Sequence, residues 1–244
     1  MTAHQAIGIH AVTAVTKTAP DSVIHVYFGE GKRNARLQKL IELVKRQNLP
    51  HSFVGVEVLD QKAPESRHQN VVAELKAMRT VTLKQLLADV GDAPQALVLV
   101  LDGVTDPHNL GACLRSANAA GASGVVIAKD RSVGMNDTVR KVASGAAEHT
   151  PLIAVTNLSN ALADLKDAGF WITGAAGETD RSVFEADLSG RRVLVMGAEG
   201  SGLRRLTREN CDELVRIPML GQVESLNVSV ACGVMLFETL RQRT

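Results

Sequence analysis

The sequence predicts an α/β protein made of two segments, a small mixed α/β segment followed by a larger open parallel sheet. Short apolar runs alternate with stretches whose apolar residues recur at helical spacing. The breakers Gly91 and Pro94 separate residues 1–75 from residues 95–244. The second segment opens with "ALVLVLDGV", a continuous apolar run that is typical of a strand buried on both faces of a parallel sheet.

The first segment, residues 1–75, alternates between strand and helix patterns. Strands are predicted at "VIHVYFG", "HSFVGVEVL" and "HQNVVAEL". Between the first two, "ARLQKLIELVKRQN" has its apolar side chains at helical spacing. Residues 76–94 contain a short amphipathic piece, "VTLKQLLADV", and are expected to link the two segments.

The second segment repeats the order strand then helix, which is typical of an open parallel sheet. Its predicted strands are "ALVLVLDGV", "GVVIA", "PLIAVT", "WITGAA", "RRVLVMG" and "VRIPM". Its predicted helices are "NLGACLRSANAAG", "DTVRKVASGAAEH", "LSNALADLKDAG", "LTRENCDEL" and a final helix from about Leu226.

The composition excludes several classes of protein. With 45% hydrophobic and 22% charged residues, the chain can bury a substantial core. Its longest apolar runs, residues 96–101 and 230–237, are far shorter than the roughly 20 residues of a membrane helix. The N-terminus lacks the features of a secretory signal. We therefore expect a soluble cytoplasmic protein with no membrane contact.

The cysteines indicate neither a disulfide framework nor a metal site. Cys113, Cys211 and Cys232 are odd in number and lack C-x-x-C spacing. They are expected to be reduced packing residues, and no metal is implied.

The charge is unevenly distributed, although its sum is only +1. Residues 1–94 hold 12 basic against 9 acidic side chains, whereas the remainder holds 15 against 17. The excess is concentrated in "GKRNARLQKLIELVKR", which contains Lys32, Arg33, Arg36 and Lys39. Two interpretations remain open at this point: a surface for phosphate backbones, or an ordinary solvated helix face.

Two loops that follow predicted strands carry unusual polar residues, and ligands of open parallel sheets bind beyond the carboxyl ends of strands. The first loop is "LDGVTDPHNLGACLRSA". Considered alone, its Asn109 would be interpreted as an ordinary helix cap and its Arg115 as a surface cation. In "VLVMGAEGSGL", glycines let the backbone approach a ligand closely. The loop departs from the dinucleotide fingerprint because Arg205 replaces the third glycine, and Glu199 would oppose a pyrophosphate.

A third stretch, "RIPMLGQVESLNVSVACGVMLFE", places polar side chains directly before an apolar helix. One of them would suffice as a cap, so Ser225 and Asn227 together indicate a lined pocket. The three loops predict a cleft bordered by Asn109, Arg115, Glu199, Ser225 and Asn227. Nucleophilic hydrolysis has little support, because the segment has no Cys-His or Ser-His-Asp pairing.

At these three loops the sequence resembles the SpoU (TrmH-like) class of RNA ribose 2′-O-methyltransferases, in the knotted SPOUT superfamily. The quoted stretches are similar to its three motifs in order and spacing, and the whole chain is similar to bacterial enzymes that methylate a guanosine in the peptidyl-transferase P loop of 23S rRNA. The resemblance implies S-adenosylmethionine as cofactor, 23S rRNA as substrate and a homodimer. It also implies a deep C-terminal trefoil knot and a ribosomal-protein-like substrate-binding domain over residues 1–75.

The resemblance also implies roles for individual residues. The cofactor site would be lined by Gly197, Glu199, Gly200, Ile217, Leu226 and Asn227. Asn109 and Asn227 would orient the ribose or the methionine end, Ser225 would position the target ribose, and Glu199 would hold a ribose hydroxyl or orient Arg115.

Arg115 is the residue to which the family assigns activation of the 2′-hydroxyl. Because a guanidinium is not deprotonated in proteins, an alternative is that Arg115 clamps a phosphate and stabilises the developing alkoxide while another acceptor takes the proton.

Three alternatives concern the target. The same chemistry could act on another rRNA nucleotide or on transfer RNA, and an RNA-binding assembly factor could keep the fold without catalysis. The last is disfavoured because every expected motif residue is present. With five Phe, one Tyr and one Trp in the chain, contacts to phosphates are expected in place of base stacking.

Overall fold

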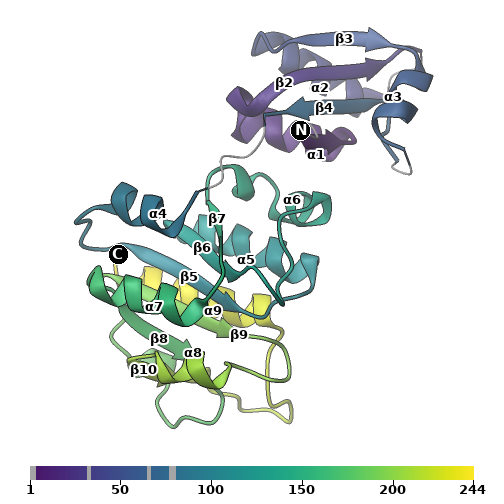
Figure 1. Ribbon diagram of the computed structural model, residues 1–244. Coiled ribbons are helices and arrows are strands. Elements are labelled where there is room, and N and C mark those ends of the chain that lie inside the picture. The colour runs from purple at the N-terminus through teal and green to yellow at the C-terminus, as the bar shows by residue number, and fades with distance from the viewer. Residues whose placement is uncertain (1–3, 32–33, 65–66, 77–80) are drawn as a thin grey trace. The chain divides into compact units, whose positions relative to one another are not determined.

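The computed structural model describes residues 4–31, 34–64, 67–76 and 81–244 (Figure 1). The chain forms two compact units, residues 1–79 and residues 80–244. Both are α/β, and the second contains the parallel sheet that the sequence predicts.

The first unit is a four-stranded mixed sheet in the order β1-β4-β2-β3. Among the described strands of this unit, β2 and β3 pair in parallel, and the other pairs are antiparallel. Helices α1 and α2 bury their apolar residues against one face of the sheet, and α3 packs Leu59 with Val72 on a smaller cluster. The elements are β1 (His4–Ile7), α1 (Ile9–Thr18), the short 3-10 helix η1 (Pro20–Ser22), β2 (Val23–Gly29), α2 (Ala35–Arg46), β3 (His51–Val54), α3 (Val56–Lys62) and β4 (Val71–Leu75).

Two features of this unit differ from the sequence prediction. The predicted strand "HSFVGVEVL" ends at Val54, and α3 begins at Val56. The alternating valines favour a strand. Burial of Leu59 and Ala63, which are four residues apart as on one face of a helix, outweighs that local preference. The β1 strand and the α1 helix were not predicted, since β1 has four residues and the β-branched residues of α1 obscure its helical period.

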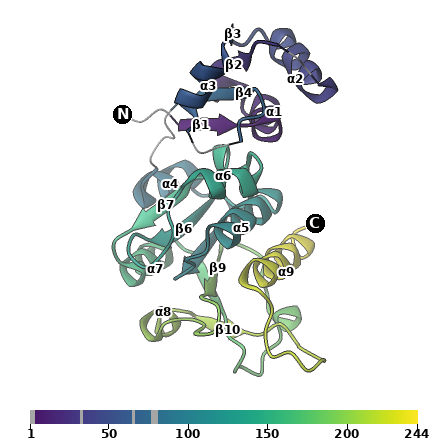
Figure 2. The ribbon, with the colours of Figure 1, turned by 90° about the vertical axis from the view of Figure 1, so that its right-hand side faces the viewer.

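The second unit is a six-stranded parallel sheet in the order β10-β8-β9-β5-β6-β7. Figure 2 shows α5 and α9 on one side of it, and α4 and α7 on the other. The elements are α4 (Leu83–Val90), β5 (Leu97–Asp102), α5 (Pro107–Ala119), β6 (Gly124–Ala128), α6 (Asp137–Ala143), η2 (Ala146–Glu148), β7 (Leu152–Val155), α7 (Leu158–Asp167), β8 (Trp171–Ala175), η3 (Val183–Glu185), β9 (Arg192–Gly197), α8 (Arg205–Glu209), β10 (Glu213–Val215) and α9 (Val228–Arg241).

The central strand β5 explains the continuous apolar run in the sequence. All six of its residues are buried. Leu99 and Leu101 face the cluster formed with α5 and α9, whereas Val98 and Val100 face the cluster formed with α4 and α7. A strand covered by helices on both faces needs apolar side chains, and in β5 these run from Leu97 to Leu101, before Asp102 ends the strand.

The segment expected as a linker, residues 76–94, contains a packed helix. Thr82 caps α4 by accepting a hydrogen bond from the Gln85 amide at 3.2 Å. Leu83 and Leu86 lie in the core of the second unit. This part of the segment is therefore an element of the second unit, because its apolar face is buried there.

The region after β9 also differs from the prediction in its boundaries. The predicted helix "LTRENCDEL" ends at Glu209, and the last strand is Glu213–Val215 in place of "VRIPM". Pairing of β10 with β8 sets this register, and the Asp212 carboxylate reinforces it by accepting a hydrogen bond from the Ile172 amide. Residues 217–227 then run without regular secondary structure to α9.

Candidate functional site

The candidate site lies at the carboxyl edge of the second unit's sheet. Strands β5 and β9 pair in parallel, and their last residues, Asp102 and Gly197, are direct neighbours. After β5 the chain turns into α5, which Asp106 caps by accepting a hydrogen bond from the His108 amide at 2.9 Å. Asn109 is therefore in the first turn of α5, where it is 8% exposed.

Three of the predicted residues meet at one carboxylate oxygen. Glu199 Oε1 accepts hydrogen bonds from Asn109 Nδ2 at 3.1 Å and from Asn227 Nδ2 at 2.6 Å. Asn227 Nδ2 also donates to Asn109 Oδ1 at 3.0 Å, and the Val228 amide lies 3.4 Å from Glu199 Oε1. Asn227 Oδ1 accepts from the Ser229 amide at 2.9 Å and so caps α9. Asn227 is both a helix cap and a member of the site network.

The glycine loop after β9 folds back on itself. The amides of Ala198 and Gly202 donate to each other's carbonyl oxygens, at 3.1 and 3.0 Å. A Cβ at Gly197 would lie 2.1 Å from the carbonyl carbon of Gly202, so a side chain there would displace the loop. Gly200 and Gly202 have positive φ, at +79° and +63°, which L side chains rarely adopt. These glycines therefore determine where Glu199 is held.

The other predicted residues lie outside this network. Arg115 is exposed on α5, six residues beyond Asn109, and the part of the chain that the structure describes offers it no hydrogen-bond or ion-pair partner. Ser225 is exposed and Leu226 is half-buried in the irregular segment before α9. Ile217 is half-buried and packs against the core. Their predicted roles toward cofactor and ribose stay predictions.

The sequence analysis missed two residues at this edge of the sheet, Asp102 and Arg204. Asp102 is fully buried, and its Oδ2 accepts a hydrogen bond from the Arg204 amide at 2.9 Å. Its Oδ1 lies 3.3 Å from Arg204 Nε. The available signal was an acidic residue that ends the apolar run "LVLVLD", because a buried carboxylate at that position requires a partner.

The predicted RNA-binding cluster is described only in part. Arg36 and Lys39 are exposed on α2, whose first turn is capped by Asn34. Lys32 and Arg33 lie outside the described residues.

Metal and thiol chemistry find no support in the described residues. Those residues include no group of three or more His, Cys, Asp or Glu side chains that could hold a metal ion. Cys113, Cys211 and Cys232 are free, and burial raises the pKa of Cys211 to about 12, so its thiol is a packing group. None of the helices in the described ranges has the length and apolar character needed to cross a bilayer.

Two family models together match most of the chain. The SpoU rRNA methylase family matches residues 96–237, and the family of RNA 2′-O ribose methyltransferase substrate-binding domains matches residues 6–81.

Curated relatives match the chain over nearly its whole length. The 23S rRNA (guanosine-2′-O-)-methyltransferase RlmB of Escherichia coli is 48% identical over 237 residues, which cover 97% of this chain and 98% of the relative. The protein of the same name from Pseudomonas aeruginosa is 52% identical over 240 residues, covering 97% and 96%.

Solved structures share the fold. The SpoU methyltransferase AviRb from Streptomyces viridochromogenes, crystallised with S-adenosylmethionine, superposes with a TM-score of 0.76 at 23% identity over 99% of this chain and 90% of its own. A crystal structure of an RNA 2′-O ribose methyltransferase gives a TM-score of 0.73 at 27% identity, covering 98% and 88%.

Proposed function

The chain belongs to the SpoU rRNA methylase family, and from this premise we propose that it transfers a methyl group from S-adenosylmethionine to the ribose 2′-oxygen of a guanosine in 23S rRNA. The observation that carries the proposal is the meeting of Asn109, Glu199 and Asn227, one from each motif loop, at the carboxyl edge of the sheet. The target we propose is the guanosine of the peptidyl-transferase P loop, and the site of action is the cytoplasm.

The residues around the glycine loop fit S-adenosylmethionine. A Cβ at Gly200 or Gly202 would meet no atom within 4 Å, so the backbone there is open to a ligand. Glu199 Oε2 has no hydrogen-bond partner among the described residues and can accept from a ribose hydroxyl. Ile217 and Leu226 are half-buried apolar side chains that suit an adenine ring. The cofactor supplies an electrophilic methyl group on a sulfonium when it is bound.

The chain's own contribution is to position the two reactants and to stabilise the charge that develops on the attacking oxygen. Attack by a ribose oxygen on the methyl carbon must be in line, so the rate depends on how firmly both reactants are held. Asn109 and Asn227 hold the Glu199 carboxylate in one orientation. Arg115 clamps a phosphate and stabilises the developing alkoxide while water or another acceptor takes the hydroxyl proton. Ser225 contacts the target ribose.

RNA binding is assigned to the first unit. Arg36 and Lys39 project from the exposed side of α2, and Lys32 and Arg33 precede them in the sequence. Such a cluster contacts phosphates through charge and makes binding dependent on salt.

A homodimer and a trefoil knot complete the proposal. The helix α9 exposes Val230 and Phe237, seven residues apart on one side, and the segment before it exposes Leu220 and Val223. Exposed apolar side chains such as these are typical of a surface covered by a partner, here a second copy. Sedimentation equilibrium of the chain tests the dimer. The knot is proposed to form where residues 217–227 lead back towards the glycine loop, since Asn227 contacts Glu199.

The decisive experiment supplies the chain with labelled S-adenosylmethionine and 23S rRNA that lacks its modifications. Ribose methylation is then mapped by protection from alkaline cleavage. One protected guanosine in the P loop is the expected result. Methylation of a different nucleotide would retain the reaction and overturn the target, whereas tight RNA binding without any transfer would favour a non-catalytic assembly factor.

A further inference from the structure

A buried carboxylate holds an arginine at the edge of the site. Asp102 is 0% exposed at the end of the central strand β5. It accepts a hydrogen bond from the amide of Arg204 at 2.9 Å, and its second oxygen lies 3.3 Å from Arg204 Nε. An isolated buried carboxylate is strongly unfavourable, so Arg204 compensates the charge of Asp102 and Asp102 fixes the direction of Arg204.

The guanidinium of Arg204 packs over the backbone of Gly103. Gly103 has a φ of +88°, and a Cβ there would lie 3.1 Å from Arg204 Nη2 and 3.5 Å from Ala198 Cβ. Glycine at this position therefore leaves the space that the guanidinium occupies. The side chain of Arg204 remains 41% exposed. Within the described ranges, the terminal nitrogens Nη1 and Nη2 meet no hydrogen-bond acceptor.

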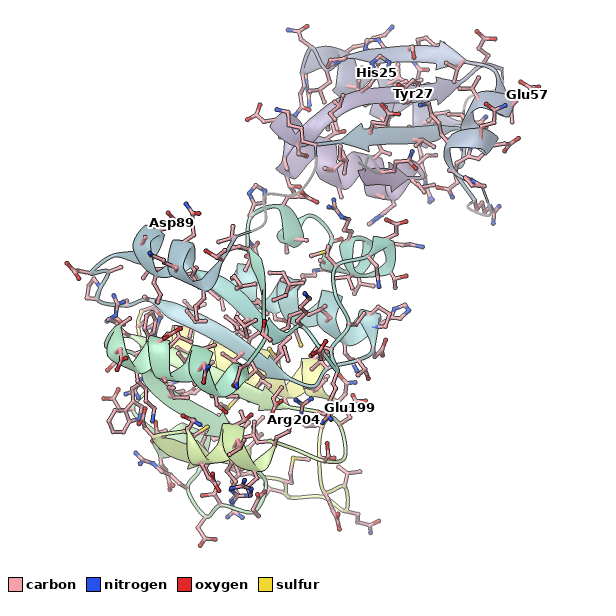
Figure 3. The ribbon with its side chains drawn as sticks, viewed as in Figure 1. His25, Tyr27, Glu57, Asp89, Glu199 and Arg204 are labelled. Atoms are coloured by element: carbon pink, nitrogen blue, oxygen red, sulfur yellow. The ribbon has the colours of Figure 1, made fainter. Side chains whose placement is uncertain are left out.

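Arg204 stands at the same edge of the sheet as the site network. Asp102 is the register neighbour of Gly197, from which the loop carrying Glu199 departs. The loop returns at Gly202, and Arg204 follows two residues later. Figure 3 shows Glu199 and Arg204 at this edge. The Asp102 contact thus anchors the returning end of the loop and presents two free guanidinium donors beside the site.

We propose that Arg204 binds a phosphate of the RNA strand whose ribose is methylated, with Asp102 as its positioning residue. The inference rests on the proposed function, because it takes RNA as the ligand of this edge. A guanidinium with two unused terminal nitrogens matches two oxygens of a phosphate. Its exposure allows a macromolecular ligand to reach it. The other anion near the site would be the methionine carboxylate of the cofactor, so the experiment separates the two.

The test uses the full chain and its Arg204→Ala variant. Binding to a 23S rRNA fragment that contains the P loop is measured by fluorescence anisotropy over a range of salt concentrations, and binding of S-adenosylmethionine alone is measured by calorimetry. Loss of a charge-assisted contact should weaken RNA binding about tenfold or more. The slope of log affinity against log salt should fall by about 0.7, the value for one phosphate of a single strand. Affinity for the cofactor should not change.

Arg205→Ala is the matched control. It removes the same charge one residue away, from a side chain that is 76% exposed and paired with Glu209 on its own helix. An equal loss of RNA affinity in both variants would overturn the proposal, because the effect would then be general electrostatics. Weaker cofactor binding with unchanged RNA binding would overturn it in favour of the methionine carboxylate, and no change in either would leave Arg204 a structural role only.

Two further variants separate positioning from folding. Arg204→Lys keeps the positive charge but lacks the planar guanidinium, so it should lose less RNA affinity than Arg204→Ala. It also provides the test if the alanine variant does not fold. Asp102→Asn keeps the size of the side chain but releases the guanidinium, and it should reduce the salt slope of RNA binding. A lower unfolding midpoint with an unchanged slope would contradict the positioning role. These binding measurements need no turnover, so they remain informative even if the intact chain fails to methylate 23S rRNA.

Discussion

The two ends of the second unit's sheet are both lined with polar side chains, but these side chains have different partners. At the carboxyl end, the Glu199 carboxylate and the Arg204 guanidinium each keep hydrogen-bonding capacity that the described residues do not use. At the amino end, Arg243 donates to the backbone carbonyls of Gln95 at 2.6 Å, Gly190 at 2.7 Å and Leu188 at 3.3 Å.

The amino end is closed further by the residues around the end of α9. Gln242 accepts from the Leu188 amide at 2.8 Å and donates to the Ala186 carbonyl at 3.0 Å. It also donates to Glu238, which in turn accepts two hydrogen bonds from Arg241. Polar groups that satisfy each other contribute to stability, whereas groups with unused capacity are available to ligands. The comparison therefore predicts activity defects at one end and stability defects at the other.

The largest effect is expected for Glu199→Ala. Removing the carboxylate on which Asn109 and Asn227 converge should lower the methyl-transfer rate by about 100-fold, as for other oriented polar groups in active sites. The unfolding midpoint should change little because the loop is held by the backbone hydrogen bonds between Ala198 and Gly202 and by the contact of Asp102 with Arg204. Single-turnover rates and thermal unfolding of the same preparation measure both quantities. Full activity in this variant would remove Glu199 from the site, and Glu209→Ala, at an exposed position of α8, serves as the control.

Arg243→Ala should show the opposite pattern. The variant leaves three backbone carbonyls without their charged donor, and we expect the free energy of unfolding to fall by about 2 kcal/mol. Methyl transfer below the unfolding transition should be retained, since the residue lies at the far end of the strands from Glu199. Urea unfolding measures the change in the free energy of unfolding.

Arg241→Ala is the matched control for Arg243. Its side chain is exposed and, among the described residues, pairs with Glu238 three residues earlier on the same helix, so its loss should lower the free energy of unfolding far less than the loss of Arg243. Equal destabilisation by the two variants would show that the amino end is not held by the Arg243 contacts.

The sequence alone predicted one of these two ends. The site residues could be predicted because they are polar and follow predicted strands, and because one polar residue would be enough to cap a helix. These residues are Asn109, Glu199 and Asn227. The Asp102–Arg204 contact spans 102 positions, and the Arg243 contacts depend on which strands are neighbours. Local sequence patterns predict neither of these contacts, because the order of the strands is decided by packing of the whole sheet.

Element boundaries failed for a related reason. Residues 56–59 were predicted as the end of a strand, yet tertiary burial of Leu59 favours a helix over residues 56–62. The last strand begins at Glu213 because β8 provides its pairing partners. A single sequence shows the tendency of a segment but not the surface against which it packs.

The smallest effect should appear in the pH dependence of stability at the amino end. Hydrogen bonds from Arg241 and then Gln242 hold the pKa of Glu238 below its ordinary value of 4.5. Burial of the Glu238 carboxylate opposes this change, but the hydrogen bonds outweigh the cost of its desolvation. A lowered folded-state pKa contributes stability that is present above 4.5 and is lost as the pH falls through the folded-state value. Glu238→Gln cannot titrate, and its unfolding free energy should therefore fall less steeply than that of the unchanged chain between about pH 5 and pH 3. If the unfolding free energies of the two proteins fall equally steeply with pH, Glu238 has the same pKa in the folded and unfolded states. The amino end would then be held by Arg243 and Gln242 without a contribution from Glu238.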